Sequence, residues 1–450
     1  MNILSERFVN KLYKMANSIS PVKVSDFAKK CFIDYLGVTL AGCKIYSDVN
    51  ERYIKDNQIS GKCHIIGNGQ MVDLHTAVMI NAFNAHVLEL DDSHRVAMTH
   101  LGAPIFSALV GVAEVYNKTI DDILNAAIVG YEAAIRLANS IQPGHKKRGF
   151  HVSGTCCTVG CAMGIASMLK YTKKEMYNVF SAAVTSAAGL LAVISGASEQ
   201  KPYNVANAAV AGVNAALYGK NFIGAVDILG DSRGFFHAMT DEVHENKLFE
   251  EGYAMVTIYQ KIYAACRHCH APIEAMLDIN CKAEKVSKIE VFVYDLAIKG
   301  HDHRCIEGVS SAKQSIPYTV AVACVRKNCG ISAFTNETIN DESVLNLAKR
   351  VFVIEDPIFT SMVPEKRAAK VIVYFNDGSQ AMKQIDYPKG EPENPITVIE
   401  MEKKYYELMK TAGFSLRFSK SLLDIVEKKS FTLIKDMFEM KNKFNVLEEK

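Results

Sequence analysis

NVANAAVAGVNAALY, residues 204–218, carries alanine and other small residues at helical spacing. Similar alanine-rich runs occupy residues 124–140, 154–169 and 175–195. Alanine has the highest helix propensity, and its small side chain lets helices pack at short interaxial distances. We therefore predict a mainly α protein in which nearly all of the first 280 residues form a large helical bundle.

Two of these helices carry clear start signals. Thr119 precedes Asp122, and Thr172 precedes Glu175, at the three-residue interval of a capping box. In that motif each side chain satisfies a free backbone N–H group of the other residue. The spacing predicts helices that begin directly after Thr119 and Thr172.

After residue 285 the pattern changes to alternation typical of strands. KIEVFVYDLAI (288–298) and RVFVIED (350–356) alternate and are rich in β-branched residues. Residues 368–387 fit a hairpin turned at Asn376-Asp377-Gly378. These segments predict a small sheet.

Helical patterns return between and after the strands. Residues 311–328 and 341–350 look helical, and amphipathic segments follow Pro395. A small α/β region therefore interrupts the helical one, and we expect the C-terminal helices to rejoin the bundle. The predicted domains are an all-helical domain of residues 1–265 and 395–450, and an α/β domain of residues 266–394.

Composition narrows the class of protein. The 450 residues carry a net charge of +2, with 49% hydrophobic and 22% charged residues, which is ordinary for a globular enzyme and argues against nucleic acid as a partner. No secretory signal is apparent, and the uncharged residues 176–198 are too rich in Ala, Ser and Gly to favour a membrane span. Twelve cysteines in such a chain indicate reduced thiols and a cytoplasmic location.

Metal and cofactor motifs are weak. Cys266 and Cys269 stand next to His270, but no second cysteine pair has the spacing of a zinc site. No glycine-rich nucleotide loop follows a strand, and no H-E-x-x-H motif occurs. We expect neither a metal nor a cofactor.

Side chains that can transfer protons are concentrated in residues 81–104, NAFNAHVLELDDSHRVAMTHLGAP. Three carboxylates and three histidines lie here between small and apolar residues. Carboxylates and imidazoles close to a helix end can carry out general acid–base chemistry. A solvated loop is the alternative, although such loops seldom repeat histidine.

Four further segments continue this pattern in order: KKRGFHVSGT (146–155), SEQKPYNVANAAVAG (198–212), YAACRHCHAPIEA (263–275) and SSAKQSIPYTVAVA (310–323). Together with residues 81–104, they resemble the MmgE/PrpD family. The resemblance runs from residue 23 to about residue 385. It implies a large helical domain built from both chain ends, an inserted α/β lid domain, a homodimer, and an active site in the cleft between the domains.

The resemblance implies catalytic roles for five residues: Asp91, His100, His151, Lys201 and His270. His100 and His151 also precede helix starts, where free N–H groups attract substrate carboxylates. Structural roles remain open, because a histidine there can cap a helix and Lys201 can be a solvated helix end.

Further residues are expected to contact substrate. They are Glu89, Asp92, Ser93, Arg267, Lys313 and Tyr318. A carboxylate does not attract a carboxylate substrate, so we expect the acidic residues to orient histidines, hold a substrate hydroxyl or act as a base. For Tyr318, packing in the core is almost as good an interpretation.

The acidic block departs from the D-x-D-D-T-like pattern of the family, since Glu89 and Ser93 replace Asp and Thr. The leading prediction is a cofactor-independent lyase for a citrate-like tricarboxylate, most like 2-methylcitrate dehydratase. The alternatives are decarboxylation of cis-aconitate to itaconate, epimerisation of iminodisuccinate, and a non-catalytic ligand-binding or scaffold protein. The predicted partner is a small di- or tricarboxylate.

Overall fold

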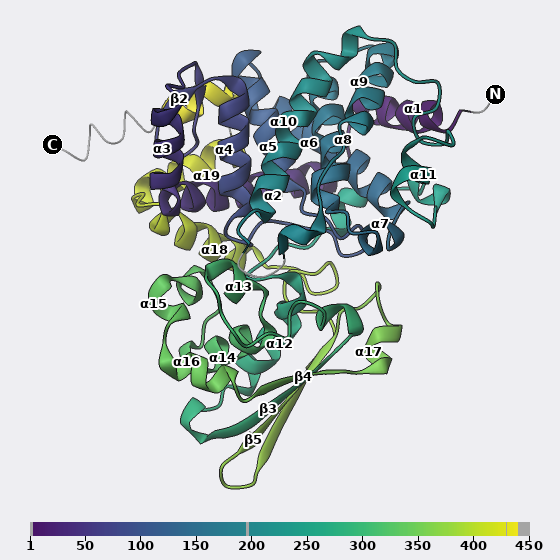
Figure 1. Cartoon of the computed structure of the whole chain (residues 1–450). Coiled ribbons are helices and arrows are strands. Elements are labelled where there is room, and N and C mark those ends of the chain that lie inside the picture. The colour runs from purple at the N-terminus through teal and green to yellow at the C-terminus, as the bar shows by residue number, and fades with distance from the viewer. Residues whose placement is uncertain (1–2, 195–197, 429, 440–450) are drawn as a thin grey trace, which may run out of the picture.

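The computed structural model describes residues 3–194, 198–428 and 430–439. Helices dominate it, which confirms the mainly α class. A body of helices lies above a smaller part that carries a four-stranded sheet (Figure 1). None of the described helices is both long and apolar enough to cross a membrane.

The first eleven helices build the helical body. Their bounds are α1 Leu4–Ala16, α2 Val22–Ile45, α3 Ser47–Asp56, α4 Leu74–His86, α5 Gly102–Val115, α6 Ile120–Asn139, α7 Gly144–Lys147, α8 Val152–Met168, α9 Lys173–Thr185, α10 Lys201–Leu217 and α11 Phe235–Met239. α8 packs between α6 and α10. A Cβ on Gly130 of α6 would lie only 2.8 Å from the carbonyl oxygen of Gly160 in α8. The predicted close packing of small-residue helices is therefore observed.

Both predicted capping boxes are confirmed. Thr119 Oγ1 accepts from the Asp122 backbone N–H at 3.1 Å, and Asp122 Oδ2 accepts from the Thr119 N–H at 3.0 Å. Thr172 and Glu175 exchange the same pair of bonds at the start of α9. Each box satisfies backbone donors that the first helical turn leaves free.

The helix predicted over residues 175–195 is wrong beyond Thr185, where α9 ends. Beyond the end of α9, Gly189 has a φ of 138°, which is outside helical geometry. The Gly189 carbonyl instead accepts from the His151 N–H at 3.1 Å, so this loop covers the start of α8. A tertiary contact thus overrides the helix propensity of this alanine-rich segment. A short 3₁₀ helix follows at Leu191–Ile194, and residue 195 lies outside the described residues.

The sheet-bearing part extends from α12 to β6 and contains the strands predicted from alternation. The strands are β3 Val286–Val293, β4 Val351–Glu355, β5 Ala369–Phe375 and β6 Gln380–Ile385. Their order is β4-β3-β5-β6, with β3 parallel to β4 and antiparallel to β5. The accompanying helices are α12 Arg267–Ile279, α13 Val309–Gln314, α14 Ile316–Arg326, α15 Asn336–Ile339, α16 Glu342–Ala348 and α17 Pro357–Ser361.

Two details differ from the sequence prediction. The helix expected over residues 311–328 is broken at Ser315, which is extended and caps α14. Pro317 in the next turn explains the break, because proline has no N–H to continue the ladder of α13. The helical body also contains a two-stranded sheet, β1 Cys63–His64 with β2 Met71–Val72, so it is not purely helical.

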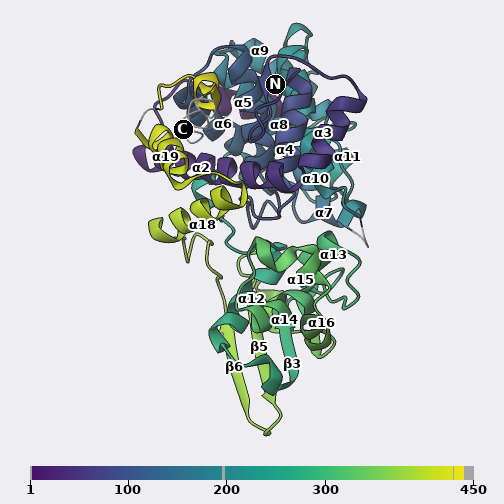
Figure 2. The same cartoon turned by 90° about the vertical axis from the view of Figure 1, so that its left-hand side faces the viewer.

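The C-terminal helices α18 Val398–Thr411 and α19 Leu416–Lys428 pack against α2, as Figure 2 shows. The Lys404 ammonium lies 2.5 Å from the buried Asp34 carboxylate and donates to the Leu90 carbonyl at 2.9 Å. Residues distant in sequence therefore meet beside the acidic block. The predicted domain boundaries, and a lid role for the sheet-bearing part, stay predictions.

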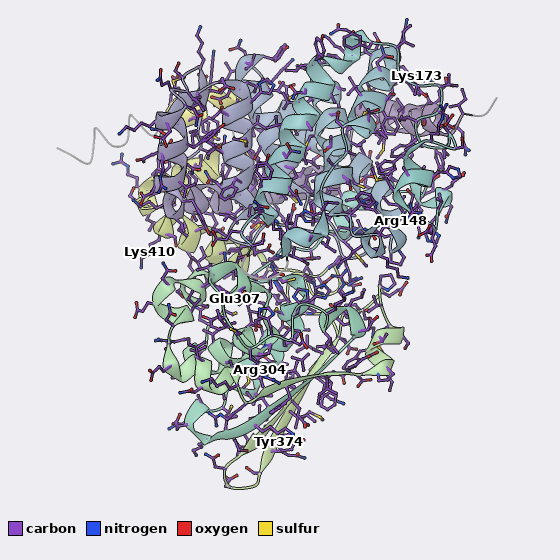
Figure 3. The ribbon with its side chains drawn as sticks, viewed as in Figure 1. Arg148, Lys173, Arg304, Glu307, Tyr374 and Lys410 are labelled. Carbon is purple, nitrogen blue, oxygen red and sulfur yellow. The ribbon has the colours of Figure 1, made fainter. Side chains whose placement is uncertain are left out.

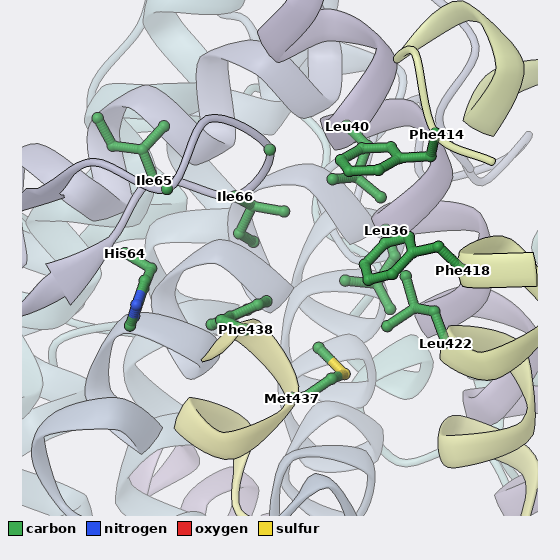
Figure 4. A pocket seen from close by; sticks show the side chains of 12 residues that line it. Leu36, Leu40, His64, Ile65, Ile66, Phe414, Phe418, Leu422, Met437 and Phe438 are labelled. Atoms are coloured by element: carbon green, nitrogen blue, oxygen red, sulfur yellow. The ribbon is translucent and has the colours of Figure 1, made fainter. Parts of the chain in front are cut away.

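A small apolar cavity of about 40 Å³ lies between α2 and the C-terminal segment (Figure 4). Leu36, Phe418 and Phe438 line it, and His64 is the polar side chain at its edge. His64 is already paired with Glu114 at 2.5 Å. This cavity lacks a group of polar side chains that could bind and transform a substrate.

Candidate active site

The acidic block begins where α4 ends. The Glu89 N–H donates to the His86 carbonyl at 2.9 Å, and Glu89 adopts a left-handed φ of 54°. Such a conformation is uncommon for a residue other than glycine, and it often marks functional sites. The turn folds Glu89 and Asp91 back toward His86, the last residue of the helix.

Glu89 is buried between two lysines. Its carboxylate pairs with Lys201 and lies 3.1 Å from Lys261 Nζ, which also donates to the Glu89 carbonyl at 3.0 Å. Burial alone would raise the pKa of Glu89, but the charges of Lys201 and Lys261 outweigh it and hold that pKa well below the ordinary value. Glu89 therefore holds two ammonium groups in place, and the predicted substrate contact of this residue stays a prediction.

Asp91 lies between two imidazoles. Its Oδ2 is 2.9 Å from His86 Nδ1 and 3.3 Å from His100 Nδ1, and the two rings lie 4.5 Å apart. Burial would raise the pKa of Asp91, but both histidines counteract it and the pKa is lowered. Burial lowers the pKa of His100 to about 3, although Asp91 opposes that shift. His100 is therefore neutral at pH 7.

The structure gives Asp92 and Ser93 internal partners. Asp92 accepts from the Tyr131 hydroxyl at 2.6 Å and from the Gly102 N–H, at the start of α5, at 2.7 Å. Ser93 donates to the Thr99 carbonyl at 2.6 Å. The substrate role predicted for Asp92 does not fit this placement, because its carboxylate is used inside the helical body. Ser93 still lines the cavity described next.

One cavity of about 80 Å³ brings His100, His151 and Lys201 together. The three residues come from separate chain segments, just before α5, at the N-cap of α8 and at the first residue of α10. Arg267 also lines this cavity, so it lies where the helical body meets the sheet-bearing part. The starts of α8 and α10 carry the positive ends of their helix dipoles, which would favour an anion in this cavity.

His151 has a defined hydrogen-bonding direction. The Asn204 side-chain amide donates to the Leu190 carbonyl at 3.1 Å and faces His151 Nδ1 at 3.3 Å. An amide donor makes His151 Nδ1 the acceptor, so the proton of the neutral ring belongs on Nε2. Burial holds the pKa of His151 well below its ordinary value, with the Lys201 charge acting in the same direction.

Besides Glu89, Asp91 and Asp92, three further predicted residues do not line the cavity. His270 Nε2 lies 3.2 Å from the Ala265 carbonyl, Lys313 donates to the Val87 carbonyl at 2.9 Å, and the Tyr318 hydroxyl donates to the Ala333 carbonyl at 2.6 Å. All three side chains are buried among protein atoms. Tyr318 thus has the packing role that the sequence left open.

His268 takes the place expected for His270. Two residues along an α-helix rotate the side chain by about 200°, so these histidines face opposite sides of α12. His268 lines the cavity, and its Nδ1 lies 2.7 Å from the Tyr294 hydroxyl. The motif spacing pointed to this turn of α12, and in the structure His268, not His270, is the histidine of that turn that lines the cavity.

The sequence interpretation missed other residues of the site. Lys146, His301 and Arg367 line the cavity, while His86 and Lys261 contact the carboxylates of Asp91 and Glu89. Lys261 had a usable signal, because it is a single charge within the apolar segment IYQKIYAAC. His86 ends α4 and Lys146 lies on α7, whereas His301 and Arg367 lie between elements and far along the chain from the acidic block.

The cavity continues outward into a larger one of about 690 Å³. Met98, Leu191 and His301 line both. Glu307, labelled at the junction of the two parts in Figure 3, lines the outer cavity. The outer cavity therefore provides a path from the surface to His100.

Two clusters among the described residues have donor atoms close enough to hold a metal ion: Cys266 with His268 and His301, and His86 with Asp91 and His100. Lysine or arginine charges act on both clusters and oppose a divalent cation. The same charges favour an anion. The absence of a metal requirement stays a prediction.

Residues 6–246 match the MmgE/PrpD N-terminal domain, and residues 263–417 match the MmgE/PrpD C-terminal domain. The chain belongs to the MmgE/PrpD family. It is 24% identical over 413 residues to a cis-aconitate decarboxylase of Aspergillus terreus, covering 84% of each chain. It is also 25% identical over 416 residues, again 84% of each chain, to the cis-aconitate decarboxylase of Aspergillus terreus strain NIH 2624 / FGSC A1156. The family and these relatives indicate a lyase-type enzyme.

Proposed function

We propose that this MmgE/PrpD protein is a cofactor-independent lyase that removes water from a citrate-like tricarboxylate, with 2-methylcitrate or a close analogue as the leading substrate. The observation that carries the proposal is the pair of neutral imidazoles, His100 and His151, with complementary free nitrogens in one cationic cavity.

His100 is the proposed base. Its Nδ1 lies 3.3 Å from Asp91 Oδ2. With the ring proton on Nδ1, next to that carboxylate, Nε2 has a lone pair that takes a proton from the carbon next to a substrate carboxylate. Asp91 then stabilises the imidazolium that forms. Lys201 stabilises the charge that develops on the adjacent carboxylate.

His151 is the proposed acid. Its Nε2–H donates to the departing hydroxyl, which leaves as water while the C–H electrons form the new double bond. The proton that His100 accepts and the proton that His151 gives are exchanged with solvent after each turnover. His151 thus replaces the acidic block as the expected partner of the substrate hydroxyl.

Decarboxylation of cis-aconitate is the second candidate, and the two named relatives support it. In that reaction a C–C bond breaks, carbon dioxide leaves, and an acid protonates the allylic carbanion. His151 Nε2–H would supply this proton. No base is needed, so Asp91 and His100 have a smaller role than in dehydration.

Proton NMR distinguishes these reactions directly. The purified protein is incubated with 2-methylcitrate, citrate, cis-aconitate and iminodisuccinate, with and without EDTA. Formation of a double bond from a hydroxy acid, unaffected by EDTA, is the expected result. Release of carbon dioxide from cis-aconitate without any dehydration would establish the decarboxylase, and no turnover of any acid would favour a binding protein.

We also propose the homodimer that the family resemblance implies. Tyr218, Phe222 and Ile223, directly after α10, are 70%, 53% and 89% exposed, and such a cluster fits a surface covered by a second copy. Sedimentation velocity is expected to give twice the mass of one chain. A monomer at micromolar concentration would contradict this.

A further inference from the structure

Four cationic side chains line the cavity. They differ in whether a neighbouring carboxylate neutralises their charge. Lys201 and Arg267 each pair with a buried glutamate. Lys146 and Arg367 make no ion pair with a carboxylate in the part of the chain that the structure describes. The cavity therefore carries two cations without a counter-charge.

Arg367 lies directly before β5 and is only 5% exposed. One of its Nη atoms donates to the Arg95 carbonyl at 2.7 Å, but its buried Nε has no hydrogen-bond partner. A buried donor without an acceptor is unfavourable, and a carboxylate oxygen would satisfy it. The guanidinium fork is suited to bidentate binding of a carboxylate.

Lys146 lies on α7 and faces the same region. Burial lowers its pKa to about 8, and the Arg367 charge acts in the same direction. Both side chains line the same cavity, so an anion bound there would lie near two positive charges that no described carboxylate neutralises. The start of α12, whose residues Arg267 and His268 line the same cavity, adds the positive end of a helix dipole.

We propose that Lys146 and Arg367 form a second carboxylate subsite, which binds the substrate carboxylate farthest from the reacting carbon. The inference rests on the proposed function for the position of the reacting carbon near His100. It predicts that the cavity prefers a tricarboxylate to the dicarboxylate that lacks one terminal carboxylate.

Binding can be measured without turnover. Propane-1,2,3-tricarboxylate, methylsuccinate and glutarate lack the hydroxyl and the double bond that the candidate reactions require. Methylsuccinate lacks one terminal carboxylate of the tricarboxylate, and glutarate lacks the central one. By isothermal titration calorimetry at constant ionic strength, we expect the tricarboxylate to bind wild-type protein about 10-fold or more tightly than methylsuccinate.

Two variants test the residues. Arg367→Gln and Lys146→Gln are each expected to weaken the tricarboxylate about 10-fold and to reduce its advantage over methylsuccinate below about 3-fold. Arg52→Gln and Lys410→Gln, at exposed positions, each remove one positive charge in the same way. They are expected to leave the affinities for the tricarboxylate and for methylsuccinate unchanged. If Arg367→Gln fails to fold, Arg367→Lys retains the charge but loses the fork, and an intermediate loss is expected.

The outcomes separate the subsite from the reaction. An unchanged preference for the tricarboxylate in both variants overturns the subsite, as does the absence of any binding to wild-type protein. If either result overturns the subsite but the NMR assay still shows turnover, the proposed function stands. Conversely, the expected binding pattern without turnover of any acid would support the subsite and reject the lyase.

Discussion

His100 and His151 are both neutral at pH 7, yet the Nε2 atoms that they present to the cavity differ in protonation in the proposed mechanism. The difference comes from their partners, since a carboxylate faces His100 Nδ1 and an amide donor faces His151 Nδ1. Neighbouring groups commonly fix the tautomer of a catalytic histidine in this way. One residue can then accept a proton while the other donates one.

Asp91→Asn tests the proposed base. The amide no longer stabilises an imidazolium at His100, so we expect kcat/KM for dehydration to fall about 100-fold or more. Steady-state rates at pH 7 provide the measurement, and thermal denaturation tests whether the variant remains folded. Wild-type kcat/KM in a folded Asp91→Asn variant would contradict the assignment.

His151→Ala and Lys201→Ala test the other two groups. Each is expected to lower kcat/KM about 100-fold or more, roughly 3 kcal/mol, because each removes a contact made to the transition state. Lys410→Gln, which changes an exposed side chain, serves as the control. Wild-type turnover by a folded variant would remove that residue from the mechanism.

At the scale of helices, close packing brings the segments of the site together. α8 carries His151 at its start and packs tightly on α6 through the contact of Gly130 with Gly160. This contact fixes the distance between the two helices, because neither position has room for a side chain. The ends of α8 and α10 are held in place by their packing along the full helices.

Gly130→Ala tests this packing. In an exposed helix the change usually stabilises a protein by up to about 1 kcal/mol. Here we expect destabilisation of about 2 kcal/mol, because the new methyl group would lie 2.8 Å from a backbone oxygen. Urea denaturation gives the free energy of unfolding. An increase in that free energy would show that α6 and α8 can separate without cost.

For the whole molecule, buried histidines make stability depend on pH. Burial lowers the pKa of seven of them: His94, His100, His145, His151, His268, His270 and His301. Below pH 6.5 the unfolded chain therefore binds more protons than the folded one, and stability is lost as the pH falls. Asp92 opposes this in part, since burial raises its pKa to about 7.

We expect the free energy of unfolding to fall by more than about 3 kcal/mol between pH 6.5 and pH 4.5, since each net proton is worth about 1.4 kcal/mol per pH unit. Urea denaturation at a series of pH values gives this slope. His100→Gln should reduce it, because one buried imidazole is removed. A flat profile would mean that these side chains take up protons while the protein stays folded.

Sequence alone determined the class of the fold and the chemistry available. Helical propensity, capping boxes and strand alternation are local properties, so Thr119, Thr172 and the hairpin at Gly378 could be predicted from their neighbours. The histidines of residues 81–104 and the segments around His151 and Lys201 were equally visible, and they carried the family resemblance.

Only tertiary structure settled which side chains share a cavity and which groups face Nδ1 of His100 and of His151. Arg367 precedes a strand more than 200 residues from His151, and no local pattern links them. The choice of His268 over His270 depended on which face of α12 meets the helical body. Likewise, the partners of Glu89 and Asp92 include Lys201, Lys261 and Tyr131, which are distant in sequence. Packing, and not spacing along the chain, therefore placed these carboxylates among protein groups.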